Sequence, residues 1–124
     1  MRGRTERKMR QTASQTASRK ANAVVAAMNA EPCRVGAQRV GCVELLALRS
    51  RIELQAIVDA GGVTAVVAAL RQHTADSDTR RYGCIVLGRL VRGDAALKQA
   101  VVDAGGVAAL VEWEKMNNKR TTVE

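Results

Sequence analysis

The sequence of 124 residues contains no phenylalanine and one residue each of tyrosine, tryptophan, histidine and proline (Tyr82, Trp113, His73 and Pro32). Because so few aromatic side chains are poor material for a deep pocket, we expect no organic cofactor. Proline breaks the interior of a helix, so a chain with a single proline can form long helices. The apolar residues, 47% of the chain, are mainly Ala, Val and Leu, whose small side chains suit closely packed helices.

Cysteine and long apolar stretches are scarce as well. The three cysteines, Cys33, Cys42 and Cys84, form no CxxC pair and do not have the spacing of zinc ligands. No apolar run reaches the roughly 18 residues of a membrane helix, and the N-terminal residues are not those of a secretory signal. We therefore predict free thiols, no metal site, no membrane span and a reducing compartment, which is the cytoplasm or, as an alternative, the nucleus.

Residues that commonly carry catalysis do not converge. His73 lies in a predicted turn beside Asp76 and Asp78, and two carboxylates at the start of a helix are better explained as N-cap residues. No glycine-rich loop follows a predicted strand, as a phosphate-binding loop would, and nothing identifies a base beside Cys33. The sequence therefore predicts that the protein is not an enzyme.

Positive charge is plentiful but local. The chain carries a formal net charge of +8, and residues 1–20 hold six of these charges because Glu6 is their only acidic residue. The basic residues of this arm are Arg2, Arg4, Arg7, Lys8, Arg10, Arg19 and Lys20. Three interpretations stay open: a solvated, disordered tail; an electrostatic contact with nucleic acid, microtubules or acidic lipid; and a mitochondrial presequence, although the arm lacks an apolar face.

The rest of the chain contains an internal repeat. The segment QAIVDAGGV at residues 55–63 returns as QAVVDAGGV at residues 99–107, 44 positions later. A second motif, RxGC at residues 39–42, returns 42 positions later at residues 81–84. The offset grows from 42 to 44 because two residues are inserted near residues 91–94, and we expect these two residues to lie in a loop.

Within each unit the apolar residues follow a helical period. From about Ser77 to Val91 they recur at three- and four-residue steps, the mark of one buried helix face. Cys84 belongs to this face, and we expect it and its counterpart in the other unit to be core residues. Gly61-Gly62 and Gly105-Gly106 each stand between two short apolar segments, where glycine can take a left-handed conformation and end a helix. The predicted unit is two short helices joined at Gly-Gly, followed by a longer third helix.

This unit resembles the armadillo repeat. The resemblance rests on VDAGGV at residues 58–63, the apolar segment that follows it as far as Leu70, the long third helix, and a second copy that matches as far as Val111. It covers roughly residues 21–116. It implies an all-α fold, a right-handed α-solenoid of stacked three-helix units, and a role as a scaffold that binds other proteins without a cofactor.

We therefore expect three regions along the chain. Residues 1–20 are a flexible basic arm or a degenerate first helix, residues 21–118 are the armadillo-type repeat domain, and residues 119–124 are a C-terminal tail. A solenoid generally needs three or more units with atypical ends, whereas this chain has about two and a half. It is therefore either a fragment of a longer solenoid or a module that covers its ends by self-association.

The two ends of the repeat domain contain residues suited to self-association and residues suited to capping. Self-association would use the helix faces at residues 21–30 and 107–116. Glu114 stands where the other copies have core residues, so we predict that it is a polar cap. Trp113 either anchors a partner or covers the last helix.

The resemblance also implies where a partner binds, since stacked third helices line the concave groove of an armadillo solenoid. The predicted groove residues, at i, i+4 and i+8 on each third helix, are Arg39, Val43, Ala47, Arg81, Ile85 and Arg89. Family members that bind nuclear-localisation peptides have ladders of Trp and Asn here, and this chain lacks both. The three arginines favour a protein or peptide partner with acidic residues. The alternative is that they are ordinary solvated surface.

Overall fold

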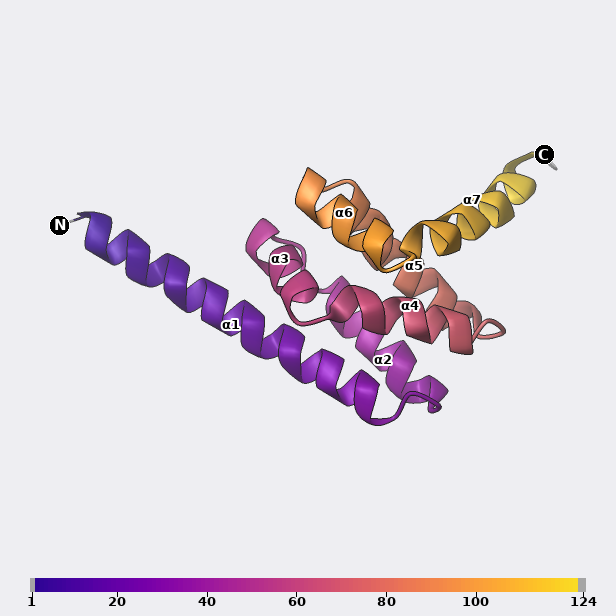
Figure 1. Ribbon diagram of the computed structural model, residues 1–124, viewed down its shortest axis with the longest axis horizontal. Helices are drawn as coiled ribbons and strands as arrows, with labels where there is room; N and C mark the ends of the chain where they lie inside the picture. Colours follow the sequence, from indigo (N-terminus) through magenta and orange to yellow (C-terminus); the bar gives the residue numbers. More distant parts are fainter. Residues whose placement is uncertain (1, 123–124) are drawn as a thin grey trace.

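In a computed structural model of the protein, the backbone is described from residue 2 to residue 122 and the side chains from residue 12 to residue 116. This part of the chain contains seven helices and no strand, which confirms the predicted all-α fold (Figure 1). The helices are α1 (Arg2–Ala30), α2 (Val35–Leu46), α3 (Arg51–Asp59), α4 (Gly62–Gln72), α5 (Ser77–Val91), α6 (Ala95–Asp103) and α7 (Gly106–Thr122).

The repeat in the sequence is also a repeat in the structure. Helices α3 and α6 each have nine residues, and each is followed by a glycine with a left-handed backbone, Gly61 at φ 82° and Gly105 at φ 80°. The second glycine of the pair lets the two helices touch, because a Cβ atom on Gly62 would lie only 2.6 Å from Ile57 Cγ2. The predicted Gly-Gly junctions are therefore confirmed, and each glycine of the pair has its own role.

Three helices begin at a capping side chain. Asp76 accepts a hydrogen bond from the backbone N–H of Thr79 at 2.9 Å, which confirms its predicted role as the N-cap of α5. Ser50 and Asp94 cap α3 and α6 in the same way. Neither of these two caps was predicted, although Ser50 and Glu53 form a capping box whose S-x-x-E pattern is visible in the sequence.

Helix α1 is continuous across the expected boundary between the basic arm and the repeat domain. It runs from Arg2 to Ala30 without a break at residue 20, and Figure 1 shows its N-terminal part projecting beyond the other helices. Ala17 and Ala21 are buried, and α1 packs against α3. Burial of this alanine face explains why the helix continues, so the structure agrees with the helical alternative for this segment and differs from a flexible arm.

The C-terminal boundary also falls inside a helix. The expected tail was residues 119–124, but α7 continues to Thr122. Residues 123–124 lie outside the described part of the chain.

The two additional residues of the later unit lie in the connection after α5, because Ser50 corresponds to Asp94 and the connection residues Arg92 and Gly93 have no counterpart. Helix α5 has 15 residues and its counterpart α2 has 12, whereas the connection after α5 (residues 92–94) is one residue shorter than the connection after α2 (residues 47–50). Leu87 and Leu90 are fully buried near the end of α5. Their counterparts in the earlier unit, Leu45 and Leu48, are buried as well. The loop prediction is therefore confirmed, and α5 in addition continues over residues 89–91, whose counterparts 47–49 are not helical.

The core is continuous through the stack, and α5 lies at its centre in contact with α2, α4, α6 and α7. Cys42 and Cys84 are buried at equivalent positions, as predicted. Burial raises the pKa of Cys42 to about 12 and that of Cys84 to about 11. Both thiols are therefore protonated and unreactive near neutral pH. The largest fully buried side chains are Met28, Leu45, Ile57, Leu87, Leu90 and Leu97.

Candidate functional site

The predicted groove residues lie on the third helices of the two units, α2 and α5, which pack against each other. Arg39 of α2 spans this contact. Its Nη2 atom lies 2.7 Å from Asp76 Oδ1, and its Nε atom lies 3.7 Å from Asp78 Oδ2. The hydrogen bond from Arg39, together with bonds from Thr79, holds the pKa of Asp76 well below its usual range. Arg39 therefore joins α2 to the first turn of α5.

Arg89 of α5 makes the return contact. Its guanidinium donates a hydrogen bond to the backbone carbonyl of Leu46, the last residue of α2, where helix carbonyls have no partner in their own helix. Arg39 and Arg89 thus bind the two third helices together. This internal role differs from the predicted one, in which both arginines were free to contact a ligand.

The other four predicted residues remain accessible. Arg81 is exposed, and no hydrogen bond or ion pair involves it within the described side chains. Val43 is 44% exposed, Ala47 is exposed at the C-cap of α2, and Ile85 is half-buried. We call these four residues the α2–α5 surface. It is an apolar strip with one free positive charge.

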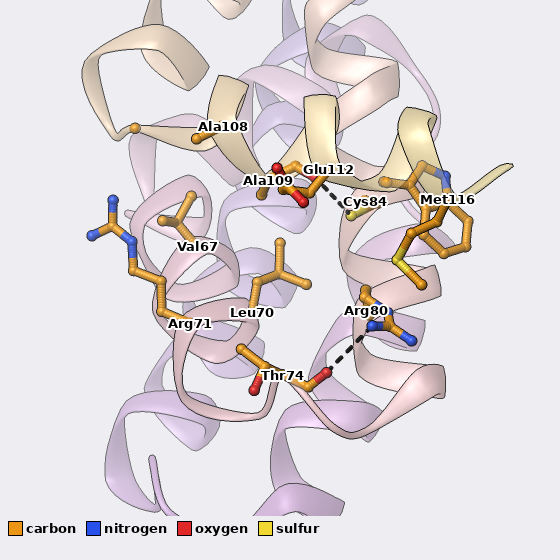
Figure 2. A pocket seen from close by; sticks show the side chains of 12 residues that line it. Val67, Leu70, Arg71, Thr74, Arg80, Cys84, Ala108, Ala109, Glu112 and Met116 are labelled. Atoms are coloured by element: carbon orange, nitrogen blue, oxygen red, sulfur yellow. Dashed lines mark hydrogen bonds between the residues drawn. The ribbon is translucent and has the colours of Figure 1, made fainter. Parts of the chain in front are cut away.

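A pocket of about 360 Å³ lies between α4, α5 and α7 (Figure 2). Val67, Leu70 and Trp113 are among the residues that line it. Arg80 contributes charge, with Nη1 bonded to the carbonyl of Thr74 at 3.4 Å and a buried Nε that has no hydrogen-bond partner. Trp113 packs half-buried against the core, so it covers the last helix, one of its two predicted roles.

A second cavity, of about 560 Å³, is lined mainly by residues of α5 and α7. We call it the α5–α7 groove. It was not predicted, although the repeat spacing contained the signal: α7 is the second helix of the later unit, and no described helix follows it. Glu114 is exposed here, which agrees with its predicted polar role. Among the residues that line the groove are Ile85, Gly88, Arg89, Leu110, Trp113 and Glu114.

The candidates for catalysis and metal binding have structural contacts. His73 Nε2 lies 2.8 Å from the carbonyl oxygen of Pro32, and Cys33 Sγ accepts a hydrogen bond from Gln72 Nε2 at 3.1 Å. These contacts fasten the connection after α1 to the end of α4. Among the described residues, no cluster of three or more His, Cys, Asp and Glu could hold a metal ion.

Two further predictions concern membranes and the basic arm. No described helix is by itself long and apolar enough to cross a membrane, although α3 and α4 together, bent by 70°, meet the length and composition of a span. Arg19 and Lys20 are exposed on α1. The side chains of the other five basic arm residues, Arg2 to Arg10, lie outside the described part of the chain.

Comparison with known proteins adds no relative. No protein-family model, curated protein or solved structure matches this chain. Its function is therefore inferred from its own residues and their arrangement.

Proposed function

We propose that this chain is a protein-interaction module of armadillo type, a short right-handed solenoid that binds a partner protein or peptide and does not catalyse a reaction. The observation that supports this proposal is the internal structural repeat. The helix pairs α3–α4 and α6–α7 share the same left-handed glycine junction, and the third helices α2 and α5 pack against each other. Stacked units of this kind present an extended surface to partners.

The partner binds along the α2–α5 surface. Exposed apolar side chains on a folded domain are candidates for contact, and Val43 and Ile85 supply them at equivalent positions of the two helices. Arg81 adds a positive charge that no acidic group among the described side chains neutralises, so it favours a partner with acidic residues. Arg39 and Arg89 contribute indirectly, because they fix the spacing of α2 and α5.

A peptide-display selection against the immobilised full chain tests this function. The selected peptides are expected to lose about tenfold in affinity for a Val43→Asp variant, because that substitution places a charge in the apolar strip. Val102→Asp is the matched control, since Val102 lies on α6 and is 45% exposed against 44% for Val43. Circular dichroism should show the same helicity for both variants.

Two results would contradict the proposed surface. The first is a selection that recovers no peptide with saturable binding. The second is a set of peptides whose affinity falls equally in the Val43→Asp and Val102→Asp variants.

A second candidate function is binding to nucleic acid or a cytoskeletal polymer through the basic part of α1. It is favoured by the projection of this helix beyond the others in Figure 1 and by the exposure of Arg19 and Lys20. The test is removal of residues 1–11, which spares the buried Ala17, combined with Arg19→Gln and Lys20→Gln. Salt-sensitive binding to DNA or microtubules should then disappear, and binding that survives the combined change would exclude this role.

A further inference from the structure

The α5–α7 groove has a counterpart inside the molecule that is already filled. One unit earlier, α5 itself lies against α2 and α4. Three contacts hold it there: Arg39 binds Asp76 and Asp78 at its start, Arg89 reaches the carbonyl of Leu46, and Gly83 packs on α4. A Cβ atom on Gly83 would lie only 3.0 Å from Leu70 Cδ2. Helix α5 is therefore a template for a helix that occupies such a groove.

The groove one unit later repeats part of the receiving side of these contacts. By the repeat spacing, Arg81 corresponds to Arg39 and Glu114 to Leu70. The carbonyl of Gly88, the counterpart of Leu46, differs because it already accepts a hydrogen bond from the N–H of Arg92 inside the longer helix α5. No described helix fills the position, and Arg81 and Glu114 are both exposed.

The apolar residues of α7 show the same open end. Val107 and Val111 are 43% and 42% exposed, whereas their counterparts on α4, Val63 and Val67, are 4% and 3% exposed. The C-terminal end of the stack is thus open where the preceding unit is covered by its neighbours.

We propose that the α5–α7 groove docks a helix of a partner protein whose first turn is acidic, so that the helix lies against α5 and α7 as α5 lies against α2 and α4. This inference rests on the proposed function and names the chemistry of the partner. Arg81 binds the acidic first turn, as Arg39 binds Asp76 and Asp78.

Glu114 makes the partner more specific. In the filled groove the corresponding residue, Leu70, contacts Gly83 of the occupying helix. A carboxylate at this place favours a basic residue where α5 has glycine, because opposite charges pair across a partly covered contact. In the spacing of α5, the partner helix therefore has acidic residues at its first and third positions and a lysine at the eighth.

A second copy of this chain is a poor occupant. Its α2 is the helix equivalent to α5, but Arg34 and Gly36 stand where α5 has Asp76 and Asp78. Arg34 would face the like charge of Arg81, which suppresses a wrong partner.

The probe is a labelled peptide with the sequence of residues 76–91, in which Gly83→Lys supplies the basic residue and Cys84→Ala removes the thiol. Fluorescence anisotropy with the full chain should show saturable binding that weakens about tenfold in an Arg81→Glu variant. Arg19→Glu is the matched control, because Arg19 is exposed on α1 and away from the groove. A peptide with Asp76→Lys and Asp78→Lys should lose affinity for the wild-type chain and regain it for Arg81→Glu.

Three outcomes would overturn the proposal: no saturable binding, equal affinity of the peptide for Arg81→Glu and Arg19→Glu, or a charge-reversed peptide that does not recover. A fourth contrary outcome would come from the mass of the full chain, measured by light scattering. A dimer that Arg81→Glu dissociates would make a second copy the occupant. Peptide binding should be unchanged in Val43→Asp, which is the test variant of the α2–α5 surface. If the probe peptide does not bind the α5–α7 groove but the affinity of the display-selected peptides still depends on Val43, the groove proposal is wrong and the proposed function stands.

Discussion

Replacing Gly61 by alanine is expected to destabilise the protein, whereas the same replacement at Gly88 is expected to stabilise it. Gly61 has φ 82° and a Cβ atom there would have no neighbour within 4 Å, so backbone strain is the only new effect in the folded state. A left-handed backbone disfavours an alanine by about 1–2 kcal/mol. The lower entropy of the unfolded chain offsets about 0.4–1 kcal/mol of this, which leaves a net loss of about 1 kcal/mol.

Gly88 lies inside α5 with ordinary helical geometry, and a Cβ atom there would also be free of neighbours within 4 Å. Alanine is favoured over glycine in a helix interior by about 1 kcal/mol. The two variants therefore add the same methyl group to equally open positions and differ in the sign of their effect because the backbone differs.

Urea unfolding followed by far-UV circular dichroism measures both changes, provided that the dependence on urea is the same in all variants. A difference of about 1 kcal/mol corresponds to a shift of about 2–6 °C in the thermal midpoint. Gly105→Ala is expected to follow Gly61→Ala, since Gly105 has φ 80° and the nearest atom to its Cβ is the flexible Nη2 of Arg71. Equal shifts in Gly61→Ala and Gly88→Ala, or a stabilised Gly61→Ala, would refute the left-handed junction.

Two further predictions concern titratable groups. A thiol reagent at about pH 8 is expected to modify Cys33 alone in the folded chain and all three cysteines after denaturation. The reason is that Cys42 and Cys84 are buried, which raises the pKa of both thiols. Modification of all three cysteines at one rate in the folded chain would contradict the burial of Cys42 and Cys84. Acid is expected to destabilise the wild-type chain more than an Asp76→Asn variant. Arg39 lowers the pKa of Asp76 in the folded chain. The contribution of Asp76 to the free energy of unfolding is therefore complete above its unfolded pKa of about 4, and it is lost as the pH falls toward the folded pKa. Urea midpoints measured against pH give the comparison, and parallel curves for the two proteins would be the contrary result.

Local features of the fold could be predicted from the sequence because their physical causes lie within a few residues. The Gly61–Gly62 junction follows from the freedom of glycine at positive φ, and the N-cap of α5 follows from Asp76 at the start of an apolar period. The burial of Cys42 and Cys84 follows from the helical period of the third helices. The S-x-x-E cap at Ser50 was equally local and could have been predicted.

Other features depended on contacts that no local pattern contains. Whether residues 12–20 continue the helix was decided by the packing of α1 on α3. The candidate site changed most. Spacing placed Arg39, Arg81 and Arg89 on matching helix faces and gave no reason to distinguish them.

The sequence by itself determined that the chain is helical, where its helices turn and which residues are equivalent in the two units. Only the tertiary structure decided which of the three arginines are free. Arg39 binds an acid 37 residues away and Arg89 a carbonyl 43 residues away, whereas Arg81 has no partner among the described side chains. The physical reason is that the helical period determines the face of the helix on which a side chain lies, whereas the helix that packs against this face determines its partner.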